Sequence, residues 1–257
     1  MDWEAPAVVL AARAYGEGDA VASVLTEAHG QHRGLARGGG SRRGAAVWQP
    51  GNLLQVRWVA RLSEQLGSFT GELAYATAAL VLDDPLLLAV ISAACAVAEG
   101  ALPERAPHPR VFAGLLRLIA NLSQGSKVLA ELVRWEADLL ADLGYGLDFS
   151  RCAVTGGAEE LAWVSPKTGR AVSDAAAGAW KPRLLRLPPF LLGPVDAGPA
   201  DWRDGLRLTG HFLARDAFGA HHKPLPPARL ALYDRVVELA RADSTNGTEA
   251  PLACLTT

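Results

Sequence analysis

The sequence predicts an α+β protein in which a small five-stranded β-barrel precedes a mostly α-helical part. Residues 5–72 divide into five short apolar segments separated by glycine- and proline-containing turns, which is typical of a small closed barrel. Beyond residue 72 the apolar residues recur every three or four positions, the period of an amphipathic helix. With 257 residues, 50% of them apolar, the chain is long enough to bury a sizeable core.

The five expected strands cover residues 5–15, 20–27, 32–38, 52–62 and 66–73. The fourth alternates clearly. One set of its residues comprises Leu54, Val56, Trp58 and Ala60, and the other comprises Gln55, Arg57, Val59 and Arg61. Because successive side chains of a strand point to opposite faces, we expect the first set to fill the barrel and the second to face outward.

The helical part divides at Asp83-Asp84-Pro85, where proline favours the start of a new helix. Further helices are expected at 110–122, 126–144, 202–218 and 228–242, with Gly144 as a stop signal. Glu136 alone interrupts the apolar stripe of the helix at 126–144. Residues 148–200 show short β-like pieces and tight turns. We expect a barrel domain at 1–76, a helical domain at 77–243 and a flexible tail at 244–257.

The net charge of −2 conceals a local concentration of arginine. Residues 29–63 contain no acid and six arginines, namely Arg33, Arg37, Arg42, Arg43, Arg57 and Arg61. Part of this stretch, HGQHRGLARGGGSRRG at 29–44, is rich in glycine. Arginine can bind phosphate through two parallel hydrogen bonds, and glycine lets the backbone approach a partner closely. Together with Trp48 as a base-stacking candidate, the pattern favours a single-strand nucleic-acid surface.

The enzyme interpretations lack the residues they need. The glycine stretch does not match a P-loop, and because it lies between two expected strands we expect no helix N-terminus after it. Neither a nucleophile elbow nor an HExxH motif occurs. His29 and His32 are spaced like a metal pair but have no second pair, so structural roles are the better interpretation. Glu17 and Asp19 are expected to hydrogen-bond the backbone of a turn. We therefore expect no enzymatic activity.

The cysteines and the apolar runs indicate a soluble cytoplasmic protein. Cys95, Cys152 and Cys254 are far apart and suggest neither a disulfide framework nor a redox pair. The longest uncharged apolar run, 85–98, is too short to cross a bilayer and is typical of a buried helix. The opening MDWEAPAVVL lacks the features of a signal peptide.

Four segments carry a resemblance to a known family. They are AYGEGDAVASVLTEAHGQHRGLARGGG, WQPGNLLQVRW, LLADLGYGLDFSRCAVTG and WVSPKTGRAVS. In their order and spacing the sequence resembles the RecO family of bacterial DNA-repair recombination mediators. The resemblance implies an OB-fold barrel and a helical domain, with binding of single- and double-stranded DNA and annealing of complementary strands. It further implies a nucleoid-associated protein that, with RecR, helps RecA displace single-strand-binding protein (SSB).

One departure from the family concerns zinc. Many members carry two C-x-x-C pairs in the region of 150–176, whereas the corresponding positions here are Cys152, Thr155, Ser173 and Ala176. One thiolate cannot form the closed tetrahedral set of a structural zinc site, so we expect no metal and no cofactor. Residues 148–195 would then be a degenerate zinc-ribbon-like insert. In it Cys152 packs as a small hydrophobe, and the candidates for holding the segment together are Leu161, Trp163 and Val164.

The family resemblance also raises the question of where an acidic, hydrophobic-ended SSB tail would bind. Such a tail needs an apolar pocket rimmed by cations, and two pairs are candidates: Lys127 with Arg134, or Arg183 with Arg186. An alternative to DNA binding remains open, because an OB-fold can also be a protein-interaction scaffold that contacts no DNA directly.

Overall fold

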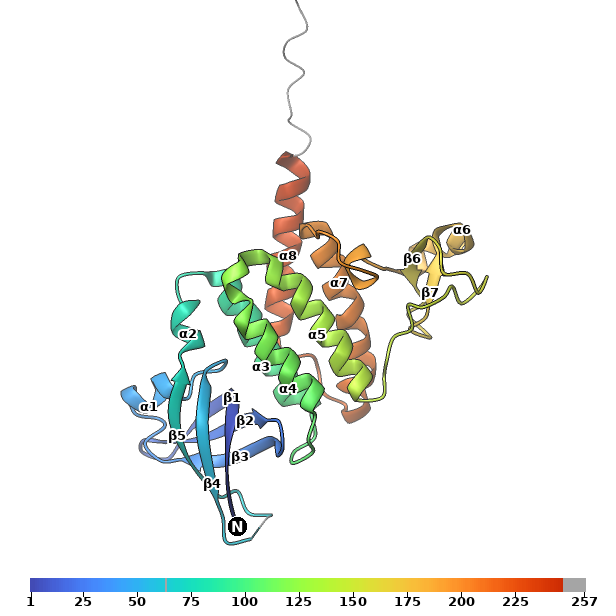
Figure 1. Cartoon of the computed structure of the whole chain (residues 1–257). Coiled ribbons are helices and arrows are strands. Elements are labelled where there is room, and N and C mark those ends of the chain that lie inside the picture. The colour runs from blue at the N-terminus through green and yellow to red at the C-terminus, as the bar shows by residue number, and fades with distance from the viewer. Residues whose placement is uncertain (63, 247–257) are drawn as a thin grey trace, which may run out of the picture.

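The computed structural model describes residues 1–62 and 64–246 and begins with a closed barrel (Figure 1). Its strands are β1 (Asp2–Tyr15), β2 (Asp19–Thr26), β3 (Gly30–Ala36), β4 (Leu53–Val59) and β5 (Ser68–Tyr75). They follow one another around the barrel in the order β1-β2-β3-β5-β4. Every neighbouring pair is antiparallel except β3 and β5, which are parallel and meet only at Leu35↔Ser68 and Ala36↔Phe69. The prediction of a five-stranded OB-fold is confirmed.

The alternation predicted for β4 is also confirmed. Leu54, Val56 and Trp58 are buried in the barrel, whereas Arg57 and Val59 are exposed on its outside. The outer residues pair across the strands with β5, which sets Arg57 beside Thr70. The outer face of β4 and β5 is therefore polar and available to a partner.

Strand β1 joins the barrel to the helices because it is buried on both faces. Ala7 and Val9 belong to the barrel core, while Val8 and Leu10 belong to the core of the helical part. A β-bulge between Val9 and Ala11 inserts one unpaired residue, Leu10, and shifts the register of the pairing with β2. The barrel and the helices thus share a continuous apolar contact.

The main helices lie near the predicted ranges, although the helix expected at 202–218 begins at Pro199 and ends at Phe212. They are α2 (Thr77–Leu80), α3 (Pro85–Ala101), α4 (Pro109–Ala120), α5 (Val128–Asp142), α7 (Pro199–Phe212) and α8 (Pro227–Asn246). Asp84 caps α3, where its Oδ1 accepts hydrogen bonds from the N–H groups of Leu86 at 2.9 Å and Leu87 at 3.1 Å. Helix α8 continues past residue 242 to Asn246, so the predicted tail begins within it. The rest of that tail, with Cys254, lies outside the described residues.

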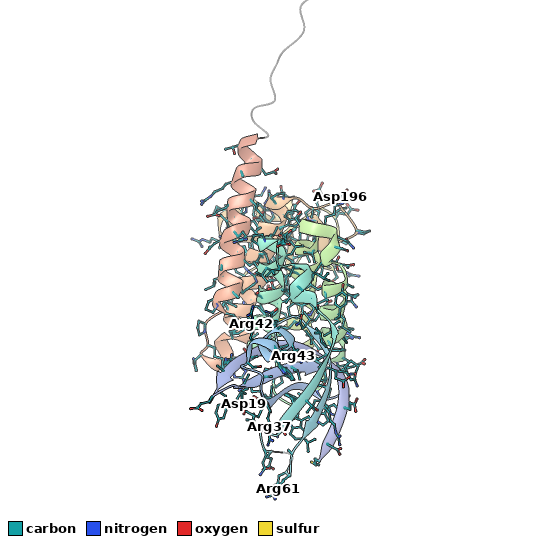
Figure 2. All side chains as sticks on the ribbon, turned by 90° about the vertical axis from the view of Figure 1, so that its left-hand side faces the viewer. Asp19, Arg37, Arg42, Arg43, Arg61 and Asp196 are labelled. Carbon is teal, nitrogen blue, oxygen red and sulfur yellow. The ribbon has the colours of Figure 1, made fainter. Side chains whose placement is uncertain are left out.

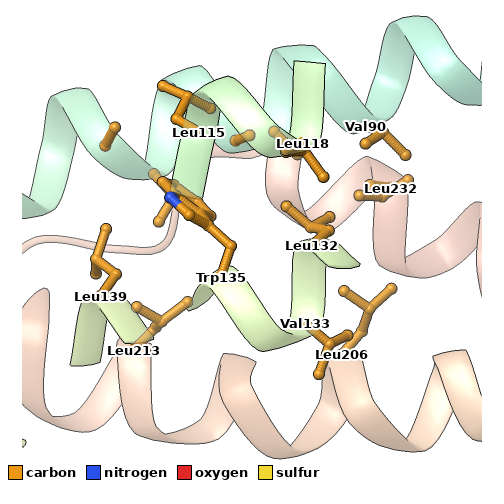
Figure 3. Packing of buried hydrophobic residues seen from close by; sticks show 14 of the residues in the cluster. Val90, Leu115, Leu118, Leu132, Val133, Trp135, Leu139, Leu206, Leu213 and Leu232 are labelled. Atoms are coloured by element: carbon orange, nitrogen blue, oxygen red, sulfur yellow. The ribbon is translucent and has the colours of Figure 1, made fainter. Parts of the chain in front are cut away.

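The helices enclose one apolar core, in which Leu115, Leu132, Trp135, Leu206 and Leu232 are completely or almost completely buried (Figure 3). Within the described residues, no helix has the length and apolar character needed to span a membrane. The shorter connecting turns are η1 (Leu122–Lys127), η4 (Leu213–Ala217) and η5 (Gly219–His221).

Glu136, the charge that interrupts the apolar stripe of α5, is fully buried in this core. It pairs with Arg229 of α8, which is 1% exposed, with Nε at 2.5 Å from Oε1 and Nη2 at 2.9 Å from Oε2. Thr209 of α7 donates to the same carboxylate at 2.5 Å. The ion pair therefore ties together three helices.

The insert projects from the side of the helical bundle (Figure 1). It contains a small sheet in the order β7-β6-β8, built from β6 (Leu161–Val164), β7 (Ala171–Ser173) and β8 (Leu185–Arg186). Between the last two strands run α6 (Asp174–Ala177) and η2 (Gly178–Arg183), and η3 (Pro189–Leu191) leads back to the bundle.

Candidate nucleic-acid interface

The connection between β3 and β4 contains a short helix, α1 (Arg42–Val47). Ser41 is its N-cap and accepts a hydrogen bond from the N–H of Gly44 at 3.1 Å. The expectation that no helix N-terminus follows the glycine stretch is wrong. Serine directly before Arg42 was the available N-cap signal, but a glycine inside a six-residue helix weakens the helical pattern.

The glycine loop before α1 is held by its own hydrogen bonds. Asp19 Oδ1 accepts from the N–H of Gly38 at 2.7 Å, and the N–H of Gly40 donates to the carbonyl of Gly18 at 2.9 Å. A Cβ atom on Gly44 would lie 2.1 Å from the carbonyl oxygen of Gly38. The glycines therefore allow close packing within the loop, and Asp19 has the predicted role of binding backbone.

A groove of about 700 Å³ runs between this loop and the outer face of β5. Arg37, Ser41 and Arg43 line one side of it, and Ser68 and Thr70 line the other. Neither Asp nor Glu is among its lining residues. We call this the barrel groove. Its second wall, made of β5 hydroxyl groups, was not expected from the sequence.

The structure separates the six candidate arginines. Arg37, Arg42, Arg43 and Arg61 are exposed, with Arg61 at the tip of the barrel away from Arg42 and Arg43 (Figure 2), and none forms an ion pair with a residue in 1–62 or 64–246. These four cations remain available to an anionic partner.

The other two candidate arginines have acidic partners. Arg57 lies beside the barrel groove next to Thr70 but pairs with Asp2 at 2.9 Å. Arg33 points toward the helical part, where its Nε lies 3.0 Å from Oε1 of Glu104. Arg33 is therefore not part of the barrel groove, since its partner, distant in sequence, draws it to the other side of β3.

Trp48 does not have the exposure of a base-stacking side chain. It is 6% exposed and packs inside the barrel, 5.9 Å from Phe69 between ring centroids. Only its edge reaches the barrel groove, so the prediction of an aromatic platform at Trp48 is wrong. The reason is that α1 turns the chain inward and buries the ring over the open end of the barrel.

The two histidines near the loop are structural, as predicted. His29 stacks on Trp3 with ring centroids 4.3 Å apart, and His32 is buried with its ring 4.6 Å from Trp58. Throughout 1–62 and 64–246, no three His, Cys, Asp or Glu side chains are grouped so that they could hold a metal ion.

The zinc positions of the insert come together without forming a ligand set. Cys152 is buried beside Ser173, whose N–H and hydroxyl donate to Sγ at 3.3 and 3.5 Å. Burial raises the pKa of the Cys152 thiol, but hydrogen bonds from Thr155 and Ser173 lower it by more, to about 6. The fourth position, Ala176, contributes only a methyl group. Thiol, hydroxyls and methyl do not fit a structural zinc ion.

Apolar packing accompanies these hydrogen bonds in the insert. Leu161 and Trp163 pack against the cluster around Cys152, as predicted. The third candidate, Val164, belongs to the large helical core instead, because it faces the opposite side of β6.

The two candidate pairs for the SSB tail lie in different places. Lys127 and Arg134 line a pocket with Val195 and Trp202, whose acidic lining residues are Glu131 and Asp196. The Arg134 guanidinium donates to the carbonyl of Phe190 at 3.2 and 3.1 Å and to Glu131 at 2.6 Å. Arg183 and Arg186 are on the insert and do not line this pocket.

Two family models match the chain. Residues 1–76 match the model described as recombination protein O N terminal, and residues 82–226 match recombination protein O C terminal. The chain belongs to the RecO family. The barrel groove lies within the first match, whereas Arg229, the partner of Glu136, lies just beyond the second.

Curated RecO relatives match over nearly their whole length. A DNA repair protein RecO from Gluconacetobacter diazotrophicus is 60% identical over 92% of this chain and 95% of its own. Those from Granulibacter bethesdensis and Acidiphilium cryptum are 56% and 58% identical, each over 95% of this chain and 98% of their own. These matches place the protein among those of DNA repair and recombination.

Proposed function

We propose that this protein is a non-enzymatic DNA-binding mediator of recombination that holds single-stranded DNA in the barrel groove. One observation carries the proposal: exposed, unpaired arginines line a groove that contains no acid. Such a groove attracts a polyanion even though the whole chain has a net charge of −2, because the local charge decides the local field.

The chemistry of the groove favours phosphate over bases as the main contact. Arg37 and Arg43 can each donate two parallel hydrogen bonds to phosphate oxygens, and Ser68 and Thr70 can donate one more each. With Trp48 buried, no exposed ring lines the groove for stacking. Binding through phosphates predicts little sequence preference and allows both single- and double-stranded DNA to bind, as annealing requires.

The wider role follows from family membership. We infer that the protein acts with RecR to help RecA load on SSB-coated single-stranded DNA. The acidic SSB tail would bind at the pocket of Lys127 and Arg134, where Trp202 and Val195 provide apolar surface. In the alternative, a scaffold function, this pocket would bind its protein partner while the barrel groove binds no DNA.

Replacing Arg37, Arg42 and Arg43 together by Ala should reduce the salt dependence of single-strand binding. Each lost phosphate contact removes about 0.7 from the slope of log K against log salt. Loss of Arg37 and Arg43 from the groove, and of Arg42 beside it, should therefore lower the slope by about 1.4 to 2. A fluorescent oligo(dT) titrated at several salt concentrations measures this slope.

The matched control replaces Arg207, Arg235 and Arg241, three exposed arginines of α7 and α8, by Ala. It makes the same change in net charge and should leave the slope within about 0.5 of wild type. Equal effects of the two triple variants would contradict the assignment to the barrel groove. Absence of DNA binding by the wild type at low salt would favour the scaffold.

A further inference from the structure

The insert carries an exposed arrangement of tryptophan and cationic side chains that the barrel groove does not explain. Trp180 in η2 is 61% exposed, although tryptophan is a residue type that is usually largely buried. The Arg183 guanidinium lies 5.4 Å from the centroid of its ring. A large aromatic ring and an arginine are therefore presented together at the surface.

A second ring with cations lies in the same segment. Trp163 of β6 is half-buried, with Arg186 at 4.5 Å and Lys181 at 5.8 Å from its ring centroid. Asp174 fixes this part, because it accepts hydrogen bonds from Trp163 Nε1 and Lys181 Nζ, both at 2.8 Å. Three cation–π contacts therefore lie within residues 163–186, two of them on the ring of Trp163 and one on the exposed ring of Trp180.

We propose that Trp180 and Arg183 form a second contact for single-stranded DNA, in which a base stacks on the Trp180 ring and the arginine binds the adjacent phosphate. Base stacking on an aromatic ring needs an unpaired base, because the bases of a duplex already cover one another. Arg186 would extend the phosphate path along β8, whereas Lys181 is held by its ion pair with Asp174. The inference rests on the proposed DNA-binding function and adds base stacking, which the barrel groove lacks.

The position of the insert would let this second DNA contact act apart from the barrel groove. The insert lies away from the barrel, on another side of the helical bundle (Figure 1). One protein would then hold DNA at two separated points, by phosphates in the barrel groove and by stacked bases on the insert. An acidic, hydrophobic-ended peptide is the competing ligand, since Trp180 would offer it apolar surface beside Arg183. Such a peptide end needs a pocket, however, whereas the Trp180 ring is 61% exposed and offers an open face on which a base can stack.

The test compares oligo(dT) with an abasic oligonucleotide of equal length, which keeps the phosphates but has no bases. Wild type should bind oligo(dT) more tightly than the abasic strand by roughly 5- to 160-fold, the range expected for a stacked base. Trp180→Ala should lose most of this preference, Trp180→Phe should keep most of it, and Arg183→Ala should weaken both ligands. Arg151→Ala, an exposed arginine of the same insert, is the control and should change neither.

Crosslinking adds a direct readout, because 5-iodouracil in the oligonucleotide should crosslink to the peptide that contains Trp180. If wild type binds both strands equally, or if Trp180→Ala keeps the preference, this inference fails while DNA binding by the barrel stands. If Trp180→Ala instead weakens only the capture of an acidic peptide, the site binds protein and the inference is wrong. If wild type binds neither strand at low salt, the proposed function fails as well.

Discussion

At the scale of single residues, His32 is unusual because it is buried and uncharged in the barrel. Its ring packs edge-on against Trp3 and Trp58, and neither ring nitrogen has a hydrogen-bond partner among the described residues. Burial lowers the pKa of His32 to about 4, and the positive charges of Arg105 and His29 add to the effect. Protonating His32 in the folded barrel is therefore unfavourable.

This predicts a loss of stability in acid. The unfolded chain takes up a proton near pH 6.5 but the folded chain only near pH 4, so the free energy of unfolding should fall as the pH is lowered across this window. The lost stability is about 3 kcal/mol, at about 1.4 kcal/mol per pKa unit. His32→Phe should flatten the profile measured by urea unfolding between pH 7 and 4. His221→Gln, at an exposed position, should not. A profile that keeps its slope in His32→Phe would contradict this role.

At the scale of elements, the pairing of Glu136 with Arg229 decides how α5, α7 and α8 assemble. Removing one member of a buried ion pair leaves the other charged without compensation, which costs about 3–5 kcal/mol. Glu136→Ala should therefore lower the free energy of unfolding by that amount. The double variant Glu136→Leu/Arg229→Met, which removes both charges, should recover most of the loss. Urea denaturation measures both, and a cost below about 1 kcal/mol for the single variant would rule out the pair as a determinant of the fold.

Elements with a sustained period could be predicted from the sequence, and short ones could not. Alternation located the barrel strands, and the stripe of α5 together with the proline that begins α3 located the main helices. Helix α1 escaped prediction because its six residues are too few to show a period. Trp48 directly follows this helix and is buried. Missing the helix therefore also explains the wrong prediction that Trp48 is exposed.

At the scale of the whole molecule, the barrel and the helices depend on a shared core. Val8, Leu10 and Leu25 of the barrel are buried against the helical part. A fragment of residues 1–76 would expose all three side chains to water. This exposure costs about 25 cal/mol of stability for each Å² of apolar surface. We expect the fragment to unfold at a lower urea concentration than the barrel in the full chain. Hydrogen exchange of the β1–β5 amides at increasing urea concentration, followed peptide by peptide by mass spectrometry, measures both, and equal midpoints would contradict the shared core.

Only part of the candidate site could be predicted, because the rest depends on how distant parts of the chain pack together. The sequence located a stretch of arginines without acids, which contains the barrel groove. Which arginines stay free depends on partners distant in the chain: Glu104 pairs with Arg33, and Asp2 pairs with Arg57. The role of β5 in the groove depends on barrel closure, and the exposure of Trp180 depends on how the insert packs. None of these follows from local pattern.

The parallel meeting of β3 and β5 over two residue pairs has a mechanical consequence. It is the shortest contact between neighbouring strands of the barrel, since each of the other strand pairs has seven or more residue pairs. The barrel groove lies over this contact. Arg37, which follows β3, lines one side of the groove, and Ser68, which begins β5, lines the other. A DNA strand bound to both sides would hold together the two strands that separate most easily. Binding in the groove and closure of the barrel therefore favour each other.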